Sequence, residues 1–121
     1  YFIYNIYWEY LHMDTNNNEK QLSMAERRKN GLLWVDTGEN MNQQVFTRGL
    51  CQDFNQTRPT ETEKKMEIWK QLFASCGENI WIEPPLTLAM GNTVTIGDGT
   101  YINSNLTLVD DYEIAIGKNV L

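Results

Sequence analysis

The sequence is poor in the residues that disulfide-stabilised and metal-dependent proteins require. It holds two cysteines, Cys51 and Cys76, and one histidine, His12, among 121 residues. Two cysteines are too few for a disulfide framework and lack metal-ligand spacing, so we interpret them as reduced thiols with a structural role in a cytoplasmic protein. A single histidine disfavours zinc hydrolase and histidine-triad chemistry within these residues, and we expect no metal site.

Positive charge and long apolar runs are also scarce. Ten Lys and Arg residues stand against sixteen Asp and Glu, which gives a net charge of −6 and a pI near 4.7. Without a basic stripe to neutralise phosphates, nucleic acid is not an expected partner. Every apolar run is broken by a charged or amide residue within a few positions, so the sequence predicts no membrane-spanning segment.

Residues 1–23 are predicted to be an aromatic leader followed by a polar linker. The first ten residues hold six of the 14 aromatic side chains, but they include no basic segment and no small-residue cleavage site, so they do not resemble a signal peptide. Residues 14–23 are polar and typical of a linker. We expect residues 1–12 to lie outside the working fold. The alternative is an aromatic strand or helix that packs on a partner.

Helical patterns occupy residues 24–76. Ser23 and Glu26 have the spacing of a capping box, which predicts a short helix to about residue 30 that Gly31 ends. A second helix is predicted over residues 41–53. Its expected apolar face consists of Val45, Phe46, Leu50 and Phe54.

A third helix follows the turn at residues 55–59. Thr60 and Glu63 match a capping box, and Gly77 is expected to end the helix. Apolar side chains at helical spacing predict its core-facing stripe. The predicted stripe is Met66, Trp69, Leu72 and Phe73, and the predicted outward residues are Lys64, Lys65, Glu67 and Lys70.

After Gly77 a six-residue rhythm replaces the helical one. The predicted apolar anchors are Ile96, Ile102, Leu108, Ile114 and Val120. Apolar anchors at every sixth residue, with small or polar residues between them, are typical of a parallel β-helix whose faces each take one hexad. The matching strings at 96–99 and 116–119 lie 20 residues apart, two more than three hexads require, so we predict a two-residue bulge near Tyr112.

Several strings together resemble one known family. They are FNQTRPTETEK at 54–64, GENIWIEPP at 77–85, NSN at 103–105 and VDDY at 109–112. These strings closely resemble the maltose/galactoside O-acetyltransferases, which are hexapeptide-repeat acyltransferases, and the resemblance covers about residues 24–121. It implies an α+β fold, with an N-terminal helical cap at 24–76 followed from 77 to 121 by the first coils of a left-handed parallel β-helix, truncated at barely one and a half coils.

The resemblance also implies an activity. Enzymes of this family transfer acetyl from acetyl-CoA to a hydroxyl of maltose, a galactoside or a related sugar, as homotrimers with active sites between adjacent β-helices and a histidine as general base. By position, Asn103 corresponds to the amide that contacts the acetyl group or its oxyanion. Asp36, Tyr101 and Asp111 correspond to acceptor-binding residues.

Simpler interpretations of these residues stay open. Asn103 and Asn105 are also typical turn residues, Asp36 also fits a turn, and Tyr101 also fits a packing role. Asp110 and Asp111 do not form a convincing glycosidase-like pair, because adjacent strand residues point to opposite faces.

Three departures from the family pattern bear on function. The catalytic histidine has no counterpart, Gln44 stands where a sugar-binding relative offers an arginine, and Ala89 stands where it offers a serine. We therefore expect these residues alone to be inactive, as the N-terminal portion of a working sugar O-acetyltransferase. The alternative is a non-catalytic truncated relative that acts as an interaction module or remnant. A more remote alternative is an unrelated binding domain that shares only the repeat.

Overall fold

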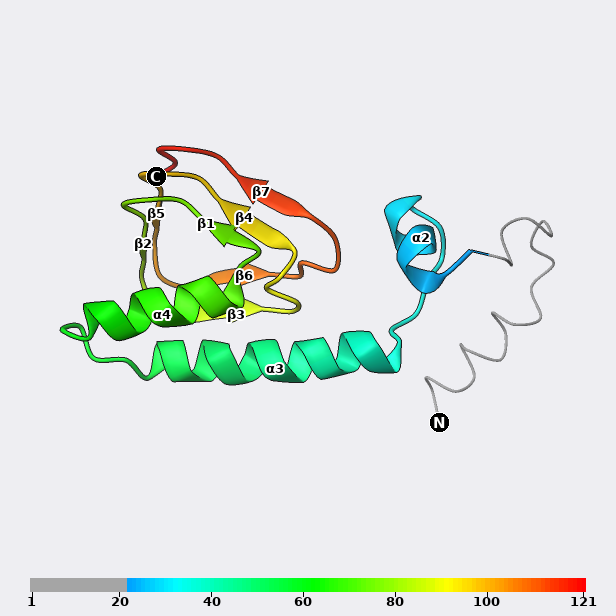
Figure 1. The fold of residues 1–121 in the computed structure, drawn as a ribbon, viewed down its shortest axis with the longest axis horizontal. Helices are drawn as coiled ribbons and strands as arrows, with labels where there is room; N and C mark the ends of the chain where they lie inside the picture. The colour runs from blue at the N-terminus through cyan, green and yellow to red at the C-terminus, as the bar shows by residue number, and fades with distance from the viewer. Residues whose placement is uncertain (1–21) are drawn as a thin grey trace. The chain divides into compact units, whose positions relative to one another are not determined.

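The computed structural model describes residues 22–121, so the leader, the linker up to residue 21 and His12 lie outside the described residues. The chain divides into two compact units, residues 1–38 and 39–121. Figure 1 shows the helices and strands of the described part. These are α2 (Met24–Lys29), α3 (Gly38–Asn55), α4 (Thr62–Leu72), β1 (Ser75–Cys76), β2 (Trp81–Ile82), β3 (Leu86–Leu88), β4 (Val94–Ile96), β5 (Tyr101–Ile102), β6 (Leu106–Leu108) and β7 (Ile114–Ile116). No helix of residues 22–121 combines the length and apolar character needed to cross a bilayer.

The described part of the first unit is built around α2. The predicted capping box is confirmed, since the Glu26 N–H donates to Ser23 Oγ at 3.2 Å and the Ser23 N–H donates to the Glu26 carboxylate at 2.8 Å. Gly31 adopts a φ of +67°, a left-handed conformation that ends the helix as predicted. The Arg28 guanidinium lies 5.2 Å from the ring centroid of Trp34.

The second unit contains a parallel β-helix with three faces. The first face consists of β1, β4 and β7, the second of β2 and β5, and the third of β3 and β6 (Figure 1). All pairings are parallel, as the hexad rhythm predicts. Cys76 pairs with Ile96, and Ile96 pairs with Ile116, so each coil advances by 20 residues.

The 20-residue coil confirms the predicted bulge near Tyr112. Steps of six residues join Ile96 to Ile102 and Ile102 to Leu108, but eight residues separate Leu108 from Ile116, which is in register with Ile96. The two extra residues therefore lie within the corner loop 109–113. The preceding coil contains the same expansion at residues 89–93, which the hexad rhythm from Ile96 onward does not indicate.

The bulge moves the last predicted anchor out of register. With an offset of 20 residues, Val120 stacks next to Thr100, whose hydroxyl accepts the Val120 N–H at 3.3 Å. Val120 is 41% exposed, and its prediction as a core anchor is wrong. Every position after the bulge is displaced by two residues relative to a strict hexad count, so Val120 is in register with Thr100 and not with the anchor Ile102.

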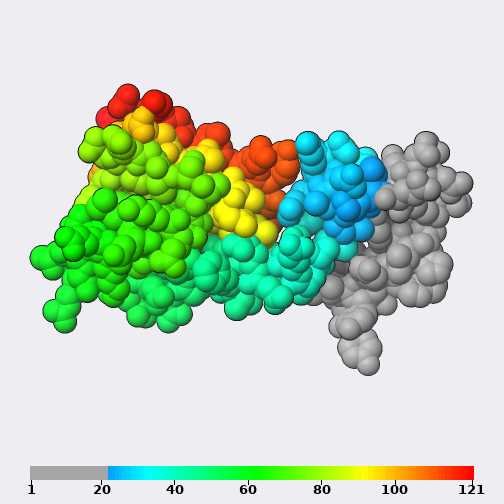
Figure 2. Space-filling view, viewed as in Figure 1, coloured from blue at the N-terminus to red at the C-terminus, as the bar shows by residue number. Residues whose placement is uncertain are grey.

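Helices α3 and α4 cover one end of the β-helix, and the coil of residues 114–121 lies at the opposite end (Figures 1 and 2). The core joins buried side chains of the helices to those that point into the coils. Phe54 lies 5.9 Å from Trp69 between ring centroids, and Trp69 lies 6.0 Å from Trp81. Leu86 and Val94 are fully buried among these aromatic residues and the inward strand residues.

Helix α3 is longer than predicted, and it buries only part of the predicted face, Phe54 and in part Leu50. The predicted face is wrong for Val45 and Phe46, which are 69% and 54% exposed. The buried residues are Thr47, Cys51 and Phe54, which have the i, i+4, i+7 spacing of one helical stripe. This stripe faces the first coil, where a polar Thr47 is accommodated because its hydroxyl donates to the Met90 carbonyl at 2.7 Å.

The predicted capping box of α4 is also wrong. The helix begins at Thr62 with Glu61 as its N-cap, and no side-chain hydrogen bond caps it. The Glu61 carboxylate instead accepts the Arg58 N–H at 2.7 Å, which closes the turn before the helix. The predicted end at Gly77 is wrong as well, because α4 ends at Leu72 and Gly77 lies at the corner after β1.

Two residues of α4 exchange their predicted sides. Met66 is 46% exposed, whereas Lys65 is only 2% exposed. Lys65 belongs to the buried stripe because its stem covers apolar surface while its Nζ lies 5.1 Å from the Trp81 ring centroid. Ile68, Trp69 and Leu72 complete that stripe.

The side chain of Asn55, the last residue of α3, caps the unpaired strand edge of the first coil. Asn55 Nδ2 donates to the Leu86 carbonyl at 2.9 Å, and the Leu86 N–H donates to Asn55 Oδ1 at 2.8 Å, so the amide imitates a neighbouring strand. Pro84 and Pro85, just before β3, have no N–H to satisfy. This end of the sheet is thereby closed to further strand pairing.

Candidate functional site

Tyr101 and Asn103 lie together on the outside of the β-helix. Tyr101 pairs in register with Trp81 and points outward, because the next residue, Ile102, points into the core. Asn103, two residues further on, is exposed on the same side. Its Oδ1 accepts the Ser104 N–H at 2.8 Å, which fixes the amide so that Nδ2 carries the hydrogens open to a ligand.

Asn105 differs from Asn103. It adopts a φ of +67° at the corner before β6, and its N–H donates to the Pro85 carbonyl at 2.9 Å. The interpretation of Asn105 as a turn residue is confirmed, since a left-handed conformation favours asparagine or glycine.

Asp111 lies at a different corner from Asn103. It is half-buried in the loop 109–113, and β6 separates the two residues along the coil. Asp36 is exposed in the first unit, two residues before α3 begins. Within the second unit the structure therefore brings Tyr101 and Asn103 together and does not bring Asp111 to them.

Asp110 has no predicted role beyond the discounted pair with Asp111, and its place inside the coil is not predicted. Its carboxylate is fully buried, and Oδ1 accepts the N–H groups of Ala89 at 2.7 Å and Met90 at 3.0 Å. Oδ2 accepts the Gly91 N–H at 2.6 Å and the Thr93 hydroxyl at 2.7 Å. The available signal was the 20-residue offset, which places Asp110 beside Met90. Asp110 is buried and Asp111 is half-buried, but both follow the end of β6, so the predicted strand alternation does not apply to them.

A cavity of about 660 Å³ lies between α4 and the first coil. Its walls include Met66, Trp69 and Trp81, with Lys70 and Glu78 among its polar lining residues. None of the predicted site residues lines it. The predicted site therefore corresponds to an open outer surface of the coils and not to this cavity.

The thiol of Cys76 also borders this cavity. Burial raises its pKa to about 11, because the surroundings disfavour the charged thiolate. Burial likewise raises the pKa of Cys51. Both thiols are unpaired and poor nucleophiles, which agrees with a structural role. Within residues 22–121 no three His, Cys, Asp or Glu side chains gather as a metal-binding set.

The β-helical segment is strongly acidic. Residues 77–121 contain six Asp and Glu and one basic residue, Lys118, a balance of −5. Lys118 Nζ lies 2.7 Å from Asp98 Oδ2, and this ammonium group, together with the Glu78 N–H, holds the pKa of Asp98 below its ordinary value. The carboxylates can accept hydrogen bonds from neutral hydroxyl groups, and residues 77–121 offer no cluster of cations for phosphates.

The chain is similar to known acetyltransferases in sequence and in structure. Residues 36–77 match the maltose acetyltransferase hexapeptide capping motif. The chain is 41% identical over 101 residues to the galactoside O-acetyltransferase of Escherichia coli, covering 83% of this chain and 50% of that protein. It is 45% identical over 73 residues to the galactoside O-acetyltransferase of Lactococcus lactis, covering 60% of this chain and 35% of that protein.

Solved structures show the same relationship. A galactoside acetyltransferase in complex with coenzyme A superposes with a TM-score of 0.77 at 38% identity, over 80% of this chain and 49% of that one. A maltose O-acetyltransferase from Clostridium difficile gives a TM-score of 0.76 at 25% identity, over 81% of this chain and 53% of that one. The chain thus spans about half the length of the relatives it matches.

Proposed function

We propose, on the premise that the chain belongs to the maltose/galactoside O-acetyltransferase family, that it carries the helical cap and first left-handed coils of an acetyl-CoA-dependent sugar O-acetyltransferase. The acceptor is a hydroxyl of maltose, a galactoside or a related sugar. The observation that carries the proposal is the outward pair Tyr101 and Asn103 on a coil that superposes on a coenzyme A-bound relative.

Each predicted site residue has a chemical task in this reaction. The Asn103 amide donates a hydrogen bond to the carbonyl oxygen that gains negative charge during acetyl transfer, and an amide can do so without losing a proton. Tyr101 offers an aromatic wall for the apolar face of a sugar ring. Asp111 and Asp36 accept hydrogen bonds from neighbouring sugar hydroxyls.

The residues of this chain fit the acetyl end of acetyl-CoA and not its phosphates. Bound acetyl-CoA supplies the acetyl group as an activated thioester. Asn103 suits that end, but residues 77–121 offer a single cation, which is already paired with Asp98. The general base that the resemblance implies is a histidine, and His12 is a poor substitute because it lies in the leader. We expect residues 1–121 alone to be inactive.

A homotrimer is supported by the separation of the site residues. Asn103 and Asp111 lie at different corners of one coil, so an active site that uses both is assembled between copies, as in the family. Light scattering on the purified protein measures this assembly. We place the protein in the cytoplasm, where Cys51 and Cys76 remain reduced.

Sugar-dependent release of coenzyme A tests the proposed activity. The full-length protein is expected to consume acetyl-CoA when maltose or a galactoside is supplied and to yield a sugar heavier by one acetyl group. Asn103→Ala is expected to lower kcat by about 10²–10³-fold, because it removes the donor to the developing charge. Its melting temperature should change little, since the side chain is exposed.

Asn105→Gly is the matched control, because glycine keeps the positive φ of this neighbouring turn residue. Its kcat is expected to equal that of the unmodified protein. A wild-type kcat in Asn103→Ala would assign Asn103 to the turn alone. A full-length protein that transfers acetyl to no sugar would favour the non-catalytic alternative.

A further inference from the structure

We propose that Asp110 is a positioning residue for the sugar acceptor. Its buried carboxylate ties the corner loop 89–93 to the loop 109–113 and so fixes the place at which Asp111 meets the sugar. These two loops are called the acceptor corner below. The inference rests on the proposed function, because it concerns how that same acceptor is held.

The carboxylate of Asp110 is the centre of the acceptor corner. Three successive backbone N–H groups, those of Ala89, Met90 and Gly91, converge on its two oxygens at 2.6–3.0 Å, and the Thr93 hydroxyl is the fourth donor at 2.7 Å. Consecutive N–H groups that surround one anion form a nest, a strong and geometrically specific arrangement. Since Asp110 is fully buried, it cannot touch a substrate itself.

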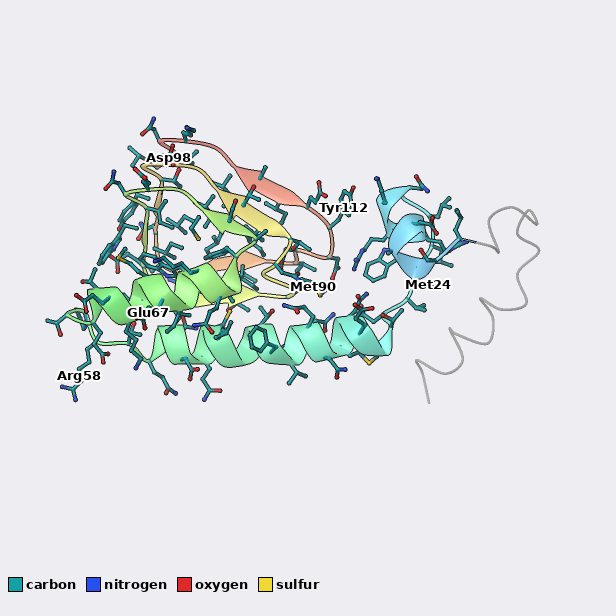
Figure 3. All side chains as sticks on the ribbon, viewed as in Figure 1. Met24, Arg58, Glu67, Met90, Asp98 and Tyr112 are labelled. Carbon is teal, nitrogen blue, oxygen red and sulfur yellow. The ribbon has the colours of Figure 1, made fainter. Side chains whose placement is uncertain are left out.

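Helix α3 holds the same loop from the other side. The Met90 carbonyl accepts hydrogen bonds from Thr47 Oγ1 at 2.7 Å and from Gln43 Nε2 at 3.0 Å. Figure 3 shows Met90 and Tyr112 at one corner of the β-helix and Asp98 at another. Loop 89–93 is therefore fixed both to the helical cap and, through Asp110, to loop 109–113 of the next coil.

This anchoring determines the position of Asp111. Loop 109–113 is two residues longer than a hexad corner requires, so it would otherwise have more conformational freedom. With Asp110 held inside the coil, the backbone one residue before the half-buried Asp111 is fixed. Recognition of a sugar hydroxyl requires the accepting carboxylate to be held within about 0.5 Å, which is what a buried anchor one residue away provides.

Ala89 is held by the same carboxylate of Asp110. The resemblance places a serine at this position, and here the Ala89 N–H donates to Asp110 Oδ1 at 2.7 Å. Both Ala89 and Asp111 are half-buried, so each is accessible from outside. Their relative placement is thus set by one carboxylate.

Asp110→Asn tests the inference with almost no change of volume. The asparagine replaces one acceptor oxygen by an NH2 group that faces backbone donors, which leaves at least one N–H without a partner. We expect KM for the sugar to rise by about tenfold or more while kcat stays within about threefold, because positioning is lost before the chemical step. Amide hydrogen exchange at residues 89–91 should accelerate by about tenfold, with Val94 and Ile96 unchanged.

Two variants of Thr93 test whether the change in sugar KM depends on the number of donors to the Asp110 carboxylate. Thr93→Val removes one of the four donors and should raise the sugar KM less than Asp110→Asn does, whereas Thr93→Ser keeps the hydroxyl and should behave as the unmodified protein. Asp98→Asn is the matched control, because it makes the same chemical change at another corner. There the carboxylate is bound by the Lys118 ammonium group and the backbone N–H of Glu78. Its sugar KM should not change.

The outcomes separate this inference from the proposed function. An unchanged sugar KM in Asp110→Asn, with transfer intact in the unmodified protein, overturns this inference alone. If Asp110→Asn does not fold, Thr93→Val decides by the same comparison of KM and amide exchange. If the unmodified protein transfers acetyl to no sugar, the proposed function fails and this inference fails with it.

Discussion

Three glycines occupy one position in successive coils, and they set how closely the coils approach. Gly77, Gly97 and Gly117 follow one another at 20-residue intervals. A Cβ on Gly97 would lie 2.7 Å from the backbone C and O of Gly117, and backbone atoms cannot move aside as a flexible side chain can. The requirement is for space and not for a left-handed conformation, because neither Gly97 nor Gly77 has a positive φ.

Gly97→Ala is therefore expected to lower the free energy of unfolding by about 1–3 kcal/mol, the usual cost of overpacking. Gly49→Ala is the control, because no described residue places an atom within 4 Å of its Cβ and the site lies inside α3. That change should raise the free energy of unfolding by about 0.5–1 kcal/mol. Urea unfolding measures both, and equal effects would show that the coils do not depend on this contact.

The thiol of Cys76 should react slowly and in a pH-dependent manner. With its pKa raised to about 11 by burial, its thiolate fraction at pH 8 is on the order of 10⁻³. Alkylation by iodoacetamide, followed by peptide mass, should be far slower in the native protein than in urea and should rise with pH up to about 11. A native rate equal to the unfolded one would contradict the burial of the thiol.

The raised pKa of Cys76 also predicts how the free energy of unfolding changes with pH. An unfolded Cys76 loses its proton at a lower pH than the folded one, so between these two pKa values the unfolded chain binds fewer protons. The free energy of unfolding should then fall as pH rises from the ordinary thiol pKa toward about 11. Cys76→Ala should lessen this fall.

Among the structural elements, α3 determines whether the first coil is closed. Asn55 satisfies both backbone groups of Leu86, so Asn55→Ala leaves a buried N–H and a buried carbonyl without partners on that side. We expect the free energy of unfolding to fall by about 1–3 kcal/mol. Asn42→Ala on the exposed side of α3 should be neutral or slightly stabilising, because alanine is the better helix former. Equal urea midpoints for the two variants would contradict the capping role.

Helix α4 shows which part of an element can be predicted from sequence. The spacing of its apolar residues predicts that the helix exists. Which face is buried and where the helix begins and ends depend on contacts with other segments. Lys65 is buried because the Trp81 ring, 16 residues away, offers it a surface, and Glu61 is used by the preceding turn instead of by a capping box. A local pattern contains neither partner, so no reading of residues 60–77 could have placed Met66 outside.

At the scale of the whole molecule, the coils bring together residues that a linear pattern leaves apart. The offset of 20 residues stacks Asp110 on Met90 and Ala115 on Thr95. It leaves Asn103 and Asp111 at separate corners, which is why we expect the active site to form between copies. The pair Tyr101 and Asn103 could be predicted to share a side, because strand alternation is local.

The sequence by itself determined the class of fold, the resemblance to one family and the bulge near Tyr112. These features depend on the spacing of residues along the chain, and that spacing is known from the sequence without any contact being known. Only the tertiary structure decided which residues are buried, that Asn55 closes the first coil and that Asp110 is an anchor inside the acceptor corner. Hydrogen bonds between coils join residues about 20 apart, and the partner of a buried carboxylate is fixed by packing in three dimensions, which the order of residues alone does not specify.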